Sequence, residues 1–271
     1  MEQQQILNLN SLEKDFGILT FEDKKTHSLR IESLGQADLV KVIPAILDYA
    51  ASHRLKKITV KASDAQAVYF YQHGFCIEAS IPAYFGMQDA IFVVRYFETN
   101  EPNLSTDQEE ILNMALGDSV IQANRELLTD IVISKCEGVF SEHISNQNQV
   151  CFTGVEKSNA SDSIMFTASL GNKVIATADS QLNKADKAVE FSNFVVNVEY
   201  EPNILISCLL ADMESYYLSI GCQTSYTLVS ADSLIINKTC ADNNYEFGGT
   251  LKNELIINEA IASLNTWFKR L

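Results

Sequence analysis

Segment 201–206 joins an apolar strand pattern to an amphipathic helix pattern, and the start of such a helix can bind an anion. It reads Glu-Pro-Asn-Ile-Leu-Ile. Unpaired N–H groups and the positive end of the helix dipole gather there, and glycine would let a phosphate approach the backbone. Glu201 instead brings a negative charge, and Pro202 has no N–H. The sequence predicts a weakened anion site, and an ordinary helix start is the alternative. The donors that remain are the backbone amides of Asn203, Ile204, Leu205 and Ile206.

Patterns on both sides of this segment define the C-terminal part of the chain. They predict strands at 188–200 and 224–231, and helices at 205–221 and 236–243. Two further strands follow, the first with Gly-Gly-Thr at 248–250. This order resembles the C-terminal half of acyl-CoA N-acetyltransferases of the GNAT class. That class grips the pyrophosphate of acetyl-CoA with a basic, glycine-rich turn between strand and helix. Segment 201–206 departs from that turn completely.

The first hundred residues repeat a shorter version of the same pattern. Strands are predicted at 27–34, 56–63, 78–85 and 89–97, with helices at 38–55 and 65–75. Gly74 suits the end of the second helix. We therefore expect a reduced GNAT-like module without a phosphate-binding turn. A plain α/β packing domain is the alternative interpretation.

The middle of the chain begins with a polar stretch, 98–107, which predicts a linker. Thr106 or Asp107 is the expected N-cap of a helix that runs to about residue 117. Apolar residues at helical spacing predict a second helix at 119–138. Strands are expected at 149–157, 163–170 and 173–182, the last two joined as a hairpin.

Two signatures make the resemblance more specific. Residues 78–84 read Glu-Ala-x-Ile-Pro-x-Tyr, and residues 248–253 read Gly-Gly-Thr-Leu-x-Asn. Together they resemble the β-lysine N-acetyltransferase family of the GNAT superfamily, over nearly the whole chain. The resemblance implies an α/β (α+β) fold, with a GNAT-type mixed sheet and helices on both faces. It implies an N-terminal module at 1–97, a linker at 98–107 and an acetyltransferase-like domain at 108–271.

The resemblance also implies roles for individual residues. Such enzymes pass an acetyl group directly from acetyl-CoA to the side-chain amine of β-lysine. Their central strand, here 188–200, carries a bulge and diverges from 224–231 to leave a V-shaped cleft. Glu190 is implied as the group that removes the amine proton, and a solvated strand residue is the alternative. Tyr245 is a late substitute for the tyrosine that reprotonates the thiolate.

Further contacts follow from the same resemblance. Asn237 is implied beside the acetyl-CoA arm, with a helix-surface amide as the alternative. The backbone of the central strand at Val195, Val196 and Asn197 is implied to meet the cofactor and the developing oxyanion. The implied substrate contacts are Asn193, Gln181 and Asn253.

Composition limits the partners. The net charge of −15 disfavours nucleic acid and anionic membranes, and it suits a small cationic amine or simple solubility. The six cysteines include no Cys-x-x-Cys pair, and no apolar run is long enough for a membrane span, so we expect a cytoplasmic protein. The four histidines have no metal-ligand spacing, so no metal is expected. A homodimer is compatible with the sequence.

Two functions remain open at this stage. The first is an acetyl-CoA-dependent N-acetyltransferase that acts on a small cationic amine. The second is a catalytically impaired pseudoenzyme that binds a small molecule or a protein. Segment 201–206 favours the second function and predicts weak acetyl-CoA binding, whereas the near-full-length resemblance favours the first.

Overall fold

The computed structural model describes residues 8–98, 102–117, 130–137, 149–151, 163–257 and 259–271. The first part of the chain forms α1 (Leu9–Phe16), β1 (Leu19–Asp23), β2 (Ser28–Ser33), α2 (Leu39–His53), β3 (Lys57–Ser63), α3 (Asp64–Tyr71), β4 (Cys76–Phe85), β5 (Gln88–Tyr96) and α4 (Thr106–Leu116). The second part forms β6 (Ile131–Glu137), β7 (Gln149–Cys151), β8 (Ser163–Leu170), β9 (Lys173–Asn183), β10 (Ala188–Asn197), α5 (Pro202–Ser219), β11 (Thr224–Ser230), α6 (Leu234–Asp242), β12 (Glu246–Ile257) and β13 (Ala260–Arg270).

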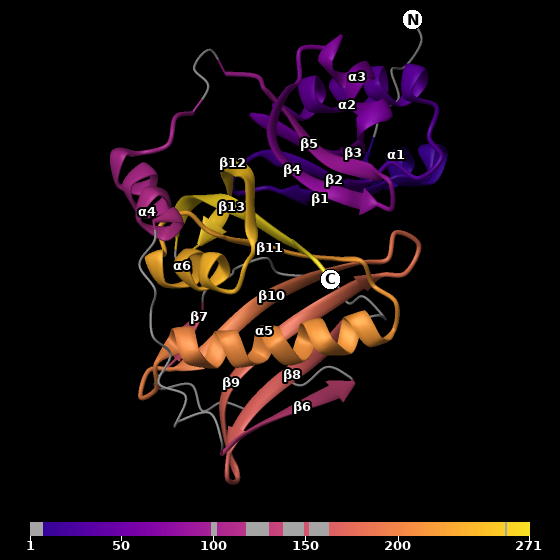
Figure 1. Cartoon of the computed structure of the whole chain (residues 1–271). Coiled ribbons are helices and arrows are strands. Elements are labelled where there is room, and N and C mark those ends of the chain that lie inside the picture. Colours follow the sequence, from indigo (N-terminus) through magenta and orange to yellow (C-terminus); the bar gives the residue numbers. More distant parts are fainter. Residues whose placement is uncertain (1–7, 99–101, 118–129, 138–148, 152–162, 258) are drawn as a thin grey trace, which may run out of the picture.

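One continuous sheet runs through both parts of the chain (Figure 1). Its order is β1-β2-β3-β5-β4-β12-β13-β11-β10-β9-β8-β6, with β7 paired to β10 outside this path. The two parts meet where Ala79 of β4 pairs with Gly249 of β12. A Cβ on Gly249 would lie 2.3 Å from the carbonyl oxygen of Glu78, so this approach requires glycine. The α/β class and the mixed sheet are confirmed, and the strands of the N-terminal module belong to the same sheet.

The two halves of this sheet repeat one design. The order β2-β3-β5-β4 corresponds to β10-β11-β13-β12, and the first two strands are parallel in each case. The turns that precede β2 and β10 also make equivalent backbone hydrogen bonds. Lys56 N donates to His27 O at 2.7 Å, and Gln223 N donates to Lys187 O at 2.8 Å. Both accepting residues have positive φ values. The predicted internal repeat is therefore confirmed. An approximate two-fold axis near Ala79 relates the two halves of the sheet.

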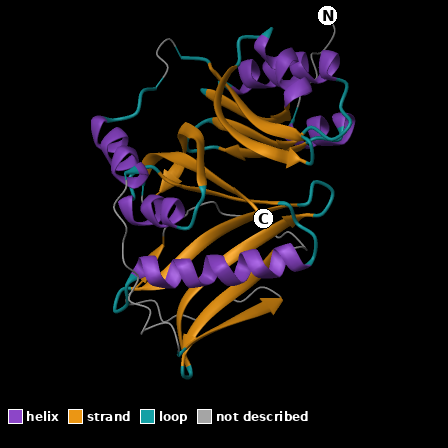
Figure 2. Ribbon diagram, viewed as in Figure 1, coloured by secondary structure: helices purple, strands orange, loops and turns teal. Residues whose placement is uncertain are grey.

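The helices of the described residues all cover the same face of the sheet (Figure 2). Leu205 and Leu209 of α5 share one apolar core with Val189 and Phe191 of β10, while the side chains of α1, α2 and α3 form a separate core with the N-terminal strands. The opposite face carries a third apolar cluster, drawn from β4, β5, β10, β11, β12 and β13. Helices were expected on both faces. The described residues place none on the second face, because it is the concave face shared by the two halves.

Local signals explain where several elements begin. Pro202 occupies the first turn of α5, where its missing N–H removes no intrahelical bond. Ser105 and Gln108 form a reciprocal capping box at the start of α4, so the cap is Ser105 and not the predicted Thr106 or Asp107. Chain segment 131–137 is strand β6, although a helix was predicted through it. The remainder of that predicted helix, and the predicted strand beyond residue 151, lie outside the described residues.

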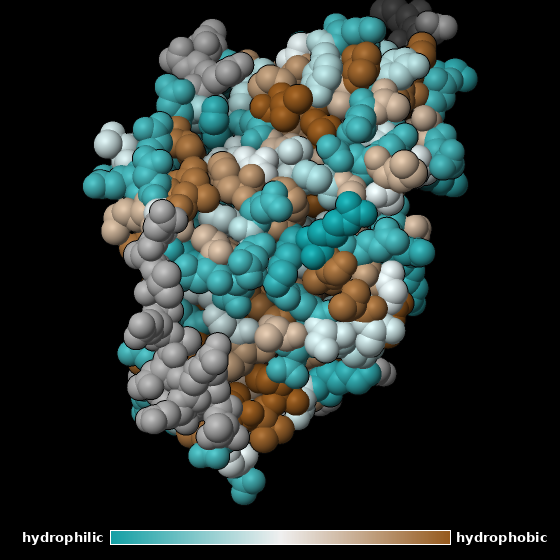
Figure 3. Space-filling model, in the orientation of Figure 1, coloured by the Kyte–Doolittle hydropathy of each residue, from teal (hydrophilic) through white to brown (hydrophobic). Residues whose placement is uncertain are grey.

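The outer surface is mixed in character. Figure 3 shows hydrophilic residues over much of one side of the molecule, with apolar residues gathered in separate patches between them. Within the described residues, no helix is long and apolar enough to cross a membrane.

Candidate active site

Strands β10 and β11 pair for only three residues and then separate. Ala188, Val189 and Glu190 pair in parallel with 224–226, after which β11 continues to Ser230 on its other neighbour, β13. Strand β10 carries a bulge between Ser192 and Val195. The predicted bulge and divergence are both confirmed, and Glu190 is the last paired residue before the strands part.

Glu190 also faces a large cavity on the concave side of the sheet. The cavity has a volume of about 720 Å³, and both halves of the chain line it. Tyr226, which pairs with Glu190 across the strands, donates a hydrogen bond from its hydroxyl to Glu190 Oε2 at 2.9 Å. Burial and the neighbouring Glu190 carboxylate raise the pKa of Tyr226 well above its usual value. The hydroxyl therefore keeps its proton and holds the carboxylate at the point where the strands diverge.

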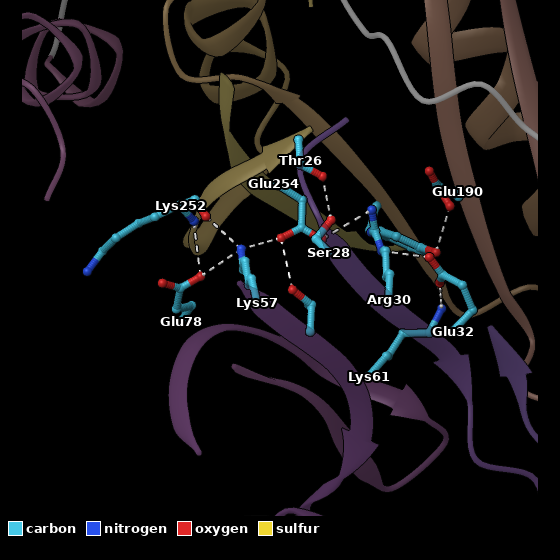
Figure 4. Close-up of polar contacts among 12 residues, drawn as sticks. Thr26, Ser28, Arg30, Glu32, Lys57, Lys61, Glu78, Glu190, Lys252 and Glu254 are labelled. Atoms are coloured by element: carbon cyan, nitrogen blue, oxygen red, sulfur yellow. Dashed lines mark hydrogen bonds and ion pairs between the residues drawn. The ribbon is translucent and has the colours of Figure 1, made fainter. Parts of the chain in front are cut away.

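The N-terminal half contributes charged side chains to the same cavity (Figure 4). Arg30 Nε lies 2.6 Å from Glu32 Oε1, and Lys61 Nζ lies 3.3 Å from Glu32 Oε2. Lys61 Nζ also lies 3.3 Å from the hydroxyl of Tyr84. Electrostatic interactions join both Arg30 and Lys61 to Glu190. Cations from one half of the molecule thus lie beside the candidate base of the other half.

A second group of buried charges adjoins the first. Lys57 Nζ lies 2.5 Å from Glu254 Oε2 and 3.6 Å from Glu78 Oε2. Glu254 also interacts with Arg30 Nη1 at 3.6 Å, which joins the two groups. Burial raises the pKa of Glu78, and the nearby Lys57 ammonium opposes this rise. Charged groups buried this deeply need partners in place.

The start of α5 retains fewer amide donors than predicted. Glu201 is the N-cap and makes no side-chain capping bond, and Leu205 N already donates to Glu201 O. The Ile206 amide lies one residue farther into the helix and is used by its ladder. Only the amides of Asn203 and Ile204 remain for an anion. Because the helix begins at Pro202, the amides of Leu205 and Ile206 lie within the helical hydrogen-bond pattern, in contrast to the predicted donors.

A lysine that the sequence did not indicate lies at this helix start. Lys238 of α6 lines a pocket of about 400 Å³ together with Glu201, Pro202 and Asn203. Its ammonium donates to Gly117 O at 2.9 Å and pairs with Asp242 at 2.9 Å. Two amides and one lysine fit phosphate oxygens, and the Glu201 carboxylate opposes them. The residues here fit the pyrophosphate of acetyl-CoA in part.

The β10 edge assigned to acetyl-CoA already has a strand partner. Val195, Val196 and Asn197 pair with residues 151, 150 and 149 of β7 in antiparallel register. Val195 and Val196 also pair with β9 on their other side. Their backbone groups are therefore not open to a cofactor or an oxyanion while β7 holds this position, in contrast to the prediction.

Two further predicted residues, Asn237 and Tyr245, lie in the core of the structure. The fully buried Asn237 amide donates to the carbonyls of residues 230 and 233 and accepts from Asn265 and Trp267, so it has no group left for a cofactor. Tyr245 bonds Ser225 in the core beneath α5, on the face opposite Glu190. These placements argue against a direct cofactor contact for Asn237 and against a catalytic role for Tyr245.

The predicted substrate contacts divide in the structure. Gln181 pairs with Glu190 across the strands and lines the cavity. Asn193 is the positive-φ residue of the β10 bulge and donates to Asp179 at 2.9 Å. Asn253 has a positive φ at a β12 bulge and is exposed, whereas the adjacent Glu254 enters the cavity. The bulge changes which residue faces inward, and the strand pattern did not indicate it.

Sequence reasoning missed Arg30, Lys61 and Tyr226. The internal repeat could have indicated Arg30. When the two halves are aligned by their strand pairing, Arg30 of β2 falls at the position of Glu190 in β10. Among the described residues, no group of His, Cys, Asp or Glu could hold a metal ion.

Comparisons with known proteins agree with the resemblance seen in the sequence. No family model matches the chain. The β-lysine N(6)-acetyltransferase of Methanococcus maripaludis is 23% identical over 250 residues, covering 88% of this chain and 91% of that protein. The N-acetyltransferase YodP of Bacillus subtilis is 21% identical over 243 residues, covering 85% of this chain and 88% of that protein.

A solved structure, the IAA acetyltransferase from Bacillus cereus, aligns with a TM-score of 0.42 at 11% identity, covering 52% of this chain and 99% of that one. The two relatives extend over nearly the whole chain, and the strand divergence at Glu190 is the arrangement that the resemblance implied. Over nearly its whole length the chain is therefore similar to known acetyltransferases.

Proposed function

We propose that this protein transfers the acetyl group of acetyl-CoA to the amine of a small cationic substrate such as β-lysine. The observation that carries the proposal is the position of Glu190. It is the last paired residue before β10 and β11 diverge, and it lines the large cavity. A carboxylate there reaches an amine in the cavity at the point where GNAT-type enzymes present their acyl group. The names of the two relatives support the same reaction class.

The charge of the buried cluster favours a cationic substrate. Its cations are Arg30, Lys57 and Lys61, and its carboxylates are those of residues 32, 78, 190 and 254. With all of them ionised, three positive charges face four negative charges. A substrate ammonium would bring the positive charges of this group to four. This count supports a cationic substrate.

Each part of the site then has its own role in the proposed reaction. Glu190 accepts one proton of the substrate ammonium, directly or through water, and the free amine can attack the thioester. The amide C–N bond then forms as the C–S bond breaks, and the second amine proton goes to the leaving CoA thiolate. Tyr226 orients Glu190 through its hydrogen bond. Acetyl-CoA supplies the activated acetyl group, and the amides of Asn203 and Ile204 with Lys238 would hold its phosphates. A pantetheine arm along β10 would require β7 to give up its pairing.

The test compares two glutamate variants with the wild type. Acetylation of β-lysine by acetyl-CoA is followed by mass spectrometry. Glu190→Gln should lower kcat by about 10²- to 10⁴-fold, as expected for loss of a general base. Glu199→Gln removes an exposed carboxylate that pairs only with Lys173 in the described structure, and it should leave kcat unchanged. Equal rates for the two variants would refute the role of Glu190.

The impaired alternative is tested in the same experiment. Wild-type protein that acetylates no amine, and whose melting temperature does not rise with acetyl-CoA, would overturn the transferase proposal. A ligand present at 100 times its Kd should stabilise the fold by roughly 2.7 kcal/mol, which such a measurement detects easily.

We also propose a cytoplasmic location. The cysteines at positions 76, 136, 208, 222 and 240 form no disulfide within the described structure, which is typical of a reducing compartment.

A further inference from the structure

Arg30 occupies the position in the N-terminal half that Glu190 occupies in the C-terminal half. Arg30 pairs with Phe21 on one side and Thr59 on the other. Glu190 pairs with Gln181 and Tyr226 in the same way. The approximate two-fold relation therefore places an arginine and a glutamate at matching points on the two walls of one cavity.

The Arg30 guanidinium has hydrogen-bonding capacity left over. An arginine carries five N–H donors in a planar fork. Within the described residues, Arg30 makes ion pairs with Glu32 at 2.6 Å and Glu254 at 3.6 Å. The buried Nε has no hydrogen bond of acceptable geometry, and the 3.6 Å separation from Glu254 is too long for one. Only 12% of the Arg30 side chain is exposed, so bulk water satisfies few of these donors.

The neighbouring cation is in a different situation. Lys61 Nζ has Glu32 and the Tyr84 hydroxyl both at 3.3 Å. An ammonium is a point charge, whereas the guanidinium fork matches the two oxygens of a carboxylate. Of the two cations beside Glu190, Arg30 is thus the one suited to a further carboxylate.

We propose that Arg30 is a specificity-determining residue, which binds a carboxylate carried by the same molecule whose amine is directed to Glu190. The inference rests on the proposed function and deepens it. A carboxylate on one wall and a guanidinium on the other are complementary to a molecule with an ammonium and a carboxylate. The N-terminal half is then part of the substrate site, and an amine that lacks the carboxylate leaves buried donors of Arg30 unpaired.

The test measures binding by calorimetry in the absence of acetyl-CoA. The two ligands are β-lysine and β-lysine amide, in which a neutral carboxamide replaces the carboxylate. Wild-type protein should prefer β-lysine by about 10- to 100-fold, the range expected for charge-assisted hydrogen bonds. Arg30→Lys should lose most of this preference. Lys41→Gln removes an exposed lysine outside the cavity lining and should keep the full preference.

A second variant guards against misfolding. Arg30→Gln alone removes one of the cations beside Glu32 and Glu254, so the Arg30→Gln/Glu32→Gln double variant removes one carboxylate as well. It should bind both ligands about equally while its circular dichroism spectrum matches that of the wild type. An unchanged preference in both Arg30 variants would overturn the proposal, as would wild-type protein that binds the two ligands equally or binds neither.

The test of Arg30 can succeed or fail independently of the test of the acetyl-transfer reaction. An Arg30-dependent preference in a protein that transfers no acetyl group would support this inference and overturn the proposed function. Acetylation of β-lysine and its amide with equal kcat/KM, unaffected by Arg30→Lys, would support the reaction and overturn the inference.

Discussion

The buried ammonium of Lys57 joins the two halves of the molecule. Lys57 belongs to β3, and its Nζ donates to Glu254 Oε2 at 2.5 Å and to the carbonyl oxygen of Lys252 at 2.6 Å, both on β12. Only 4% of its side chain is exposed. Lys57→Met keeps the length of the side chain and removes the charge. The variant therefore leaves Glu254 and Glu78 buried without their main cation.

Breaking a buried ion pair from one side costs about 3–5 kcal/mol, because the remaining charge stays desolvated. For a chain of this size, each kcal/mol lowers the melting temperature by about 2–4 °C, so the loss is on the order of 10 °C. The adjacent Lys56 is a matched control. Its ammonium lies 3.0 Å from Glu98, and both side chains are more than half exposed. Lys56→Met should therefore cost less than about 1 kcal/mol.

The assay is urea unfolding followed by circular dichroism and by the fluorescence of the buried Trp267. The Lys57→Met/Glu254→Gln double variant should recover part of the loss, because it removes a charge that the single variant leaves uncompensated. Equal unfolding midpoints for the Lys57→Met and Lys56→Met variants would refute the reasoning. So would a double variant less stable than the single one.

Three more outcomes follow from particular environments. Gly249→Ala should lower the melting temperature much more than Gly171→Ala, because the new Cβ at 249 would meet strand β4 at 2.3 Å while that at 171 meets nothing within 4 Å; equal losses would contradict the close strand approach. Burial raises the pKa of Tyr217 to about 12, so the unfolded chain, with its tyrosines near 10, releases protons first. Stability should thus fall as pH rises from about 10 to 12, and a melting temperature that stays constant across this window would be contrary evidence. A maleimide should label exposed Cys76 in the native protein and reach Cys240 only after unfolding, because burial raises the pKa of the Cys240 thiol; mass spectrometry would reveal the opposite order.

Local patterns were enough to predict most elements of the two repeated halves. Strand β10 is largely apolar and mostly buried, and Pro202 marks the first turn of the following helix. The hairpin at Gly171 was also predicted correctly, since glycine supplies the positive φ that the turn needs. These features depend on residues close together in sequence, which is why the sequence alone indicated them.

Strand β6 shows where local reasoning failed. Its apolar residues satisfy a helical spacing when they are read with the preceding segment. Pairing with β8, from Ile131 opposite Leu170 to Glu137 opposite Ile164, determines the strand instead. That pairing is non-local, and a short run of β-branched residues cannot be assigned to helix or strand from its period alone.

The site was predicted in part for a similar reason. Glu190 was identified because it lies on the central strand of the resembling family. Arg30 and Lys61 were not, because they come from strands far away in the sequence that meet Glu190 only through the approximate two-fold arrangement. The polar strand residue Asn253 was chosen in place of Glu254, because a backbone bulge decides which of the two faces the cavity.

The proposed site has an amine side, around Glu190, and an acetyl-CoA side, at the start of α5. The two sides differ in how much stability they cost the protein. On the amine side, several charged groups are buried, among them Arg30, Lys61 and Glu254. A fold with apolar residues of similar volume in their place would often be equally stable or more stable. Such an arrangement is typical of a site that binds a charged ligand. On the acetyl-CoA side, Glu201 and Pro202 weaken phosphate binding, but neither of them lines the cavity that contains Glu190. The changes near α5 therefore bear on affinity for acetyl-CoA, while the groups that would select and deprotonate an amine remain assembled.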